Sequence, residues 1–139
     1  MAAPRVLVAS GTLSGVDHEI FGSNELMHQA VHVRVVLTED GIPQSLASWS
    51  KGWGGECYLE VNMTAQLQEN RHILVTVNGK LFEGTDETPT DLEDEKTQMA
   101  LVPRGGLPVP FTMQLNSSGF GGGDSATISV TFVNTIAEG

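Results

Sequence analysis

The chain has 139 residues, of which 40% are hydrophobic, and it carries a formal net charge of −10 at pH 7. This length predicts a single domain spanning residues 1–139, with enough buried surface for a core of its own. The negative charge repels phosphate backbones, so nucleic acid is excluded as an expected partner. No apolar run approaches the roughly 20 residues that a membrane-spanning helix needs.

Alternating apolar and polar residues, which are typical of half-buried strands, recur along most of the chain. In chain order, strands are expected at Arg5–Leu13, Val16–Phe21, Gln29–Thr38, Cys57–Thr64, His72–Asn78, Lys80–Phe82, Lys96–Val102, Val109–Leu115 and Ser125–Asn134. Two stretches, Asn24–Ala30 and Thr64–Asn70, have a signal for one helical turn each. Asn78-Gly79 is expected to form a two-residue hairpin turn, because both residue types tolerate a positive φ angle.

These short strands and the turn signals between them predict an all-β fold. The expected architecture is a single antiparallel β-sandwich of about eight or nine strands, and a small closed β-barrel is the alternative. Greek-key-like crossings are favoured over a simple meander, because the Gly- and Pro-rich connections differ in length.

The N-terminal residues and the cysteine content indicate where in or outside the cell the protein is expected. The opening sequence MAAPRVLVASG lacks the basic segment and the apolar segment of about 7–15 residues that mark a secretory signal. The expected location is therefore the cytosol, or the outside of the cell after unconventional export. Cys57 is the single cysteine, so no intramolecular disulfide can form. Its alternating apolar neighbours predict a small buried residue rather than a nucleophile.

The segment EGTDETPTDLEDEK, residues 83–96, holds seven carboxylates between Glu83 and Glu95. A loop is expected here, because Pro89 interrupts any continuous helix. Calcium takes six to eight oxygen ligands, mostly carboxylate and carbonyl, so calcium is the candidate cofactor. The candidate metal ligands are Asp86, Asp91, Glu93, Asp94 and Glu95, with Asp17 and Asp124 as candidates from a second loop. The spacing matches no calcium-loop motif, and the alternative is a solvated connector that discourages edge pairing.

Both tryptophans of the chain lie in SWSKGWGGE, residues 48–56. An exposed indole among polar residues offers a platform for a sugar ring or an anchor for a protein partner. The candidate ligand-binding residues are therefore Trp49, Lys51 and Trp53, joined by Asp124 of the glycine-rich segment GFGGGD. The alternative is that the indoles fold back and cap the core.

The unusual residues thus fall in expected loops, where binding residues of rigid scaffolds usually lie. The favoured function is a non-catalytic module that binds a glycan or a protein through loops at one end of the sandwich, with calcium assisting. A structural subunit of a homo-oligomer is the first alternative, because Val36 and Val133 place apolar side chains on otherwise polar faces. A small β-barrel enzyme is the second alternative, with a pocket lined by His18, Glu19, Asp17 or Tyr58, but no nucleophile motif supports it.

Overall fold

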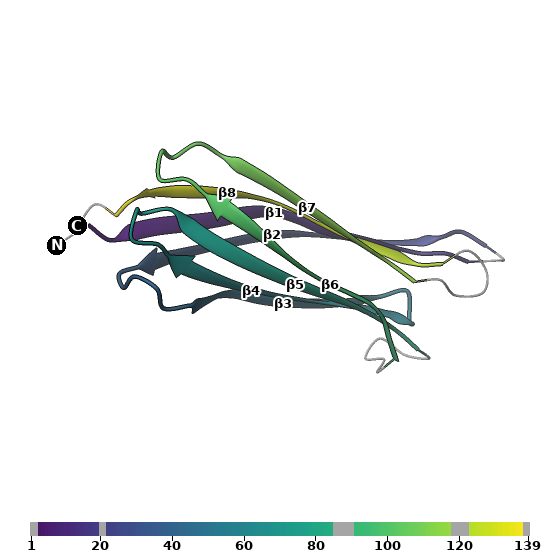
Figure 1. Ribbon diagram of the computed structural model, residues 1–139. Coiled ribbons are helices and arrows are strands. Elements are labelled where there is room, and N and C mark those ends of the chain that lie inside the picture. The colour runs from purple at the N-terminus through teal and green to yellow at the C-terminus, as the bar shows by residue number, and fades with distance from the viewer. Residues whose placement is uncertain (1–2, 20–21, 85–90, 118–122, 138–139) are drawn as a thin grey trace.

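The computed structural model describes residues 3–19, 22–84, 91–117 and 123–137, which form eight strands and no helix. The strands are β1 (Arg5–Asp17), β2 (Glu25–Leu37), β3 (Gln44–Trp53), β4 (Cys57–Leu67), β5 (Ile73–Glu83), β6 (Asp91–Val102), β7 (Val109–Asn116) and β8 (Ser125–Ile136). They build two antiparallel four-stranded sheets that lie face to face, in the orders β2-β1-β8-β7 and β3-β4-β5-β6 (Figure 1). The predicted β-sandwich is confirmed, and the described strands close no barrel.

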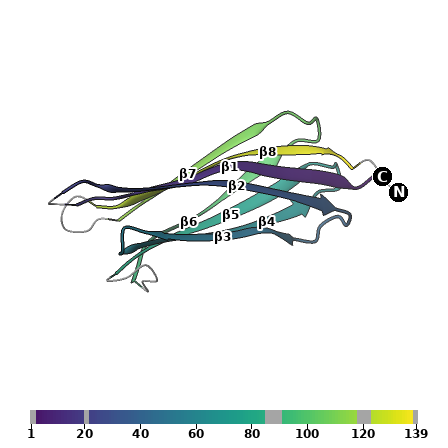
Figure 2. The same cartoon turned by 180° about the vertical axis from the view of Figure 1, so that it is seen from behind.

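The chain crosses between the sheets twice, from β2 to β3 and from β6 to β7. Strands β6 and β7 lie along one side of the sandwich (Figure 1), and β2 and β3 lie along the other (Figure 2). We call the end where β1 begins and β8 ends the terminal end. The opposite end, where β1, β5 and β7 end and β4 and β8 begin, is called the acidic end. No helix among the described residues is long and apolar enough to cross a membrane.

The core lies between the sheets and follows from the two-residue period of the strands. Strand β4 shows this most regularly, because Cys57, Leu59, Val61 and Met63 are buried and the residues between them are not. The first sheet contributes Leu7, Leu13, Ile128 and Phe132 to the same cluster, among others.

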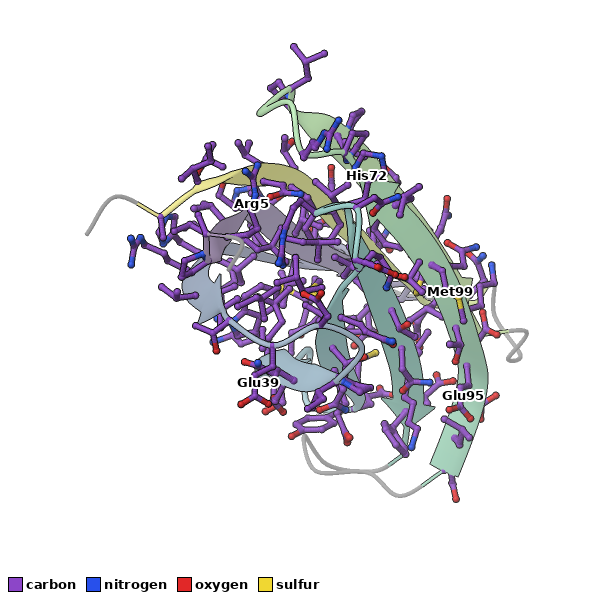
Figure 3. The ribbon with its side chains drawn as sticks, turned by 60° about the vertical axis from the view of Figure 1, so that its left-hand side comes forward. Arg5, Glu39, His72, Glu95 and Met99 are labelled. Carbon is purple, nitrogen blue, oxygen red and sulfur yellow. The ribbon has the colours of Figure 1, made fainter. Side chains whose placement is uncertain are left out.

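Polar side chains join the two sheets at the terminal end, which Figure 3 brings forward with Arg5 labelled. The Arg5 Nε donates a hydrogen bond of 2.8 Å to Asn134 Oδ1, and its Nη2 donates one of 2.6 Å to the Arg104 carbonyl. The Asn134 side chain, which is fully buried, donates to the carbonyls of Arg71 and Val102. These hydrogen bonds connect the β4–β5 turn and the end of β6, in the second sheet, to β1 and β8 in the first sheet.

The hairpin predicted at Asn78-Gly79 is wrong, because both residues lie inside the continuous strand β5. A Cβ on Gly79 would lie only 2.9 Å from Met113 Sδ and 3.0 Å from Ile128 Cδ1, which both belong to the opposite sheet. Glycine is therefore present here for close packing between the sheets and not for a positive φ angle.

Gly79→Ala is expected to lower the free energy of unfolding by about 1–3 kcal/mol, because the added methyl overpacks the space between the sheets. Urea denaturation measures this loss. Gly105→Ala is the matched control, because nothing lies within 4 Å of its Cβ position, and its stability should stay near that of the parent protein. Equal stability of the two variants would contradict the close approach of the sheets at Gly79.

The remaining differences concern edges and strand lengths. Strand β3 was not predicted, and β6 begins at Asp91, inside the segment expected to be a loop. Both are edge strands of the second sheet, where one side of the strand has no neighbour and polar or charged residues are common. The helical turns expected at Asn24–Ala30 and Thr64–Asn70 are wrong, since β2 and β4 run through most of these residues.

Candidate cation-binding site at the acidic end

Acidic side chains from both sheets meet at the acidic end. Asp17 is the last residue of β1 and Asp124 immediately precedes β8, its neighbour in the first sheet. Cys57 begins β4 and is paired with Glu83 at the end of β5 in the second sheet. Asp17, Cys57 and Asp124 are buried, and one ligand atom of each lies within 4.8 Å of the others. We call Asp17, Cys57, Glu83 and Asp124 the inner cluster.

The turn between β3 and β4 covers this cluster. Gly54 has a φ angle of 66°, and a Cβ on it would collide with the Asp17 carboxylate. A Cβ on Gly15 would likewise collide with the Trp53 indole ring. The glycine at position 54 thus lets the turn backbone close over Asp17, which retains 2% of its accessible surface, and the glycine at position 15 lets the Trp53 ring pack against β1.

The buried carboxylates are incompletely hydrogen-bonded. Asp124 Oδ1 accepts a hydrogen bond of 2.9 Å from the His18 backbone N–H. Asp17 Oδ2 and Asp124 Oδ2 are both buried without a hydrogen-bond partner among the described residues. A buried ionised oxygen without a partner is costly. The cluster therefore requires either a proton shared between carboxyl groups or a bound cation.

The ionisation of the cluster follows from burial and from its own negative charges. Burial, and then the negative charge of Asp124, raise the pKa of Asp17 to about 7. A hydrogen bond with Asp124, and then burial, raise the pKa of Glu83 to about 7. Burial alone would raise the pKa of Asp124, but hydrogen bonds from Glu83 and from the His18 N–H lower it. Burial, followed by the charges of Asp124 and Asp17, raises the pKa of the Cys57 thiol. At pH values below about 7, Asp124 thus holds the negative charge, and Asp17 and Glu83 retain protons.

A second group of carboxylates adjoins the inner cluster and shares Asp17 with it. One oxygen each of Asp17, Glu19 and Glu56 lies within 4.8 Å of the others, and we call these three residues the outer cluster. Glu19 follows the end of β1, and Glu56 lies in the turn before β4. Both glutamates are more exposed than Asp17. This all-oxygen set suits a hard cation such as calcium.

The predicted metal ligands are only partly brought together. Asp17 and Asp124, expected to complete a site from a second loop, lie side by side. Asp86 falls outside the described residues. None of the other four predicted ligands belongs to a group of close ligand atoms among the described residues. All four lie on β6: Asp91, Glu93, Asp94 and Glu95. Asp94 accepts a hydrogen bond from the Asn116 N–H, whereas Glu95, labelled in Figure 3, accepts one from Asn78. Because Asp94 and Glu95 are consecutive residues of a strand, their side chains point to opposite faces of the sheet.

The predicted ligand-binding residues Trp49, Lys51 and Trp53 lie on strand β3 and not in a loop. Trp53 is only 5% exposed and belongs to the core, and Trp49 packs against the core from the edge. The side chain of Lys51 is exposed. Trp53 therefore packs its ring against Gly15 of β1 and presents no open face on which a sugar could stack.

Sequence reasoning did not place Cys57 or Glu83 in a site. Each stands at a strand end in an ordinary alternating pattern, so only the strand register reveals that they meet. Comparisons with protein-family models and with curated proteins produced no match. Function is therefore inferred from the chemistry of the acidic end.

Proposed function

We propose that the protein is a non-catalytic binding module in which a calcium ion at the outer cluster assists ligand binding. The observation that carries this proposal is the position of Asp17. Its Oδ2 is buried without a hydrogen-bond partner among the described residues, and Glu19 and Glu56 lie beside it. Three carboxylates from two segments, the end of β1 and the turn before β4, supply the type of ligand that calcium prefers.

The same arrangement supports a role in recognition. Three carboxylates fill only part of a shell of six to eight oxygens, so the remaining positions are open to oxygen atoms of a ligand. The hydroxyl groups of a glycan or a carboxylate of a protein would complete the shell. The site lies where strands end on a rigid sandwich, the usual place for binding residues. The net charge of −10 draws cations toward it.

Calcium is expected to raise the melting temperature by several degrees in a thermal melt compared with EDTA at the same ionic strength. A cation that binds only the folded state stabilises it by about 2.7 kcal/mol at 100 times its Kd. Glu56→Gln should remove most of this shift, because it takes one charged ligand from the outer cluster.

Glu93→Gln is the matched control, since Glu93 lies on β6 outside the outer cluster. Its calcium shift should equal that of the parent protein. Loss of the shift in Glu93→Gln but not in Glu56→Gln would place the ion in the acidic segment of β6 and overturn the assignment. Absence of any shift in the parent protein would overturn the calcium role altogether. A glycan array with calcium or with EDTA then tests whether the ligand is a glycan.

A further inference from the structure

The inner cluster differs in chemistry from the outer one because it contains sulfur. The Cys57 thiol lies with the carboxylates of Asp17 and Asp124, and the ligand atoms of all three are within 4.8 Å of one another. Calcium and magnesium take oxygen ligands, whereas a thiolate favours zinc and other borderline or soft metals. The two clusters are therefore suited to different ions, although they share Asp17.

The inner cluster also offers a fourth ligand. Glu83 on β5 is the register partner of Cys57 on β4, so its carboxyl borders the same group. Zinc is usually held by four ligands in a tetrahedron, at about 2.3 Å for sulfur and about 2.0–2.2 Å for carboxylate oxygen. The ligand atoms of Asp17, Cys57 and Asp124 lie within 4.8 Å of one another, so a bound ion would draw them closer together.

The unpartnered oxygens are the second and independent observation. Asp17 and Asp124 are 2% and 4% exposed, and the Oδ2 of each is buried without a hydrogen-bond partner among the described residues. Unsatisfied buried carboxylates are expensive unless they are protonated or coordinate a cation. A metal ion between them satisfies both oxygens at once.

The surroundings hold the ligands in place. The His18 N–H fixes Asp124 Oδ1 at 2.9 Å, and the Gly54 backbone packs against the Asp17 carboxylate. Such contacts orient metal ligands and tune their affinity. The four ligands come from β1 and the residue before β8 in one sheet, and from β4 and β5 in the other. An ion bound here would therefore join the two sheets.

We infer that the inner cluster is a zinc-type metal site, with Cys57 as the thiolate ligand and Asp17, Asp124 and Glu83 as the carboxylate ligands. This goes beyond the proposed calcium-assisted binding and concerns a different class of ion. When the metal–sulfur bond forms, the thiol proton leaves to solvent, together with any proton shared among the carboxyls. Metal affinity should therefore rise with pH.

Cobalt(II) is the probe, because it takes zinc sites and reports its ligands in its absorption spectrum. The full chain, freed of metal, should develop a thiolate-to-cobalt charge-transfer band in the near ultraviolet and visible bands typical of tetrahedral cobalt. Zinc should abolish both sets of bands at one equivalent. Cys57→Ser should lack the charge-transfer band, and Asp124→Asn should bind cobalt at least about tenfold more weakly.

Glu56→Gln is the matched control, since it alters the outer cluster alone and should leave the cobalt spectrum unchanged. Cys57→Ser should in turn keep the calcium shift in melting temperature, so failure of one assignment is distinguishable from failure of the other. If Cys57→Ser folds poorly, Asp124→Asn tests the site in its place. Its amide oxygen can still accept the hydrogen bond from the His18 N–H, so this variant is expected to fold. A parent protein without the charge-transfer band, or a Cys57→Ser variant that retains it, would overturn the inference. Cobalt bands that zinc does not displace would also overturn it.

Discussion

Asn134→Ala is expected to lower the free energy of unfolding by about 3–5 kcal/mol, because it breaks a buried polar network around a guanidinium. Asn134 is fully buried on β8, and its Oδ1 accepts a hydrogen bond of 2.8 Å from Arg5 Nε. Its Nδ2 donates to the carbonyls of Arg71 and Val102, at 2.9 and 3.0 Å. Alanine leaves one charged donor and two carbonyls without these partners, around a side chain that is fully buried.

Urea denaturation of the variant and the parent protein at one pH measures this loss. Asn116→Ala is the matched control, because Asn116 is exposed at the end of β7 and, within the described ranges, its side chain accepts one hydrogen bond, from exposed Gln114. That variant should lose less than about 0.5 kcal/mol. Asn134→Asp keeps an acceptor for Arg5 but loses both donated hydrogen bonds, so it should lie between alanine and the parent. A loss below about 1 kcal/mol for Asn134→Ala would show that the network contributes little.

The sheet faces were largely predictable from alternation. The pattern placed Cys57, Leu59, Val61 and Met63 on one face, and all four are buried. It also aligned Ala126, Ile128, Val130 and Phe132, which the structure buries too. Alternation works because a strand in a sandwich has one face on the core and the other on solvent, so burial repeats every second residue.

Two features of the fold were beyond such reasoning. Gly79 has the sequence of a hairpin turn, but its role depends on Met113 and Ile128 of the other sheet. No local pattern reports the distance between sheets. Strand β3 carries serines, a lysine and a glycine because it is an edge, and edge strands follow propensity least.

Only part of the candidate site was predicted from the sequence, and that part was predicted from residue type alone. Asp17 and Asp124 were named because carboxylates bind cations, and the structure does bring them together. The acidic segment was given more weight because its charges are close in sequence. Once β6 is a strand, however, neighbouring residues such as Asp94 and Glu95 face opposite ways. The residues that meet are those at strand ends, and their proximity depends on register.

In metal-free buffer the protein is expected to lose stability as the pH rises from about 5 to about 8. Asp17 and Glu83 both have a pKa of about 7 in the folded state, raised mainly by burial for Asp17 and by the Asp124 hydrogen bond for Glu83. In the unfolded chain these groups titrate near pH 4. Between these values the folded state binds more protons than the unfolded state, so the free energy of unfolding falls with rising pH.

The stabilising contribution of these protons is complete below pH 4 and is lost once both groups have ionised, above about pH 7. Each pKa unit corresponds to about 1.4 kcal/mol. Because the two groups share Asp124 as a neighbour, their shifts are not independent, and a total loss of about 3–5 kcal/mol is expected. The lowered pKa of Asp124 acts in the opposite direction, but only at pH values below about 4. Stability should therefore be greatest near pH 4–5.

Urea denaturation in EDTA across this pH range measures the loss. Asp17→Asn should flatten the curve and make the protein more stable than the parent at pH 8, because a neutral amide donates to Asp124 without a charge. Asp91→Asn is the control for general charge repulsion, since Asp91 is exposed at the start of β6, and its curve should keep the slope of the parent.

A divalent cation should restore stability at pH 8 and have little effect at pH 5, because protons and the cation compete for the same oxygens. A parent protein equally stable at pH 5 and pH 8 in EDTA would show that the carboxyls at the acidic end share no proton, and Asp17 would then be ionised without compensation.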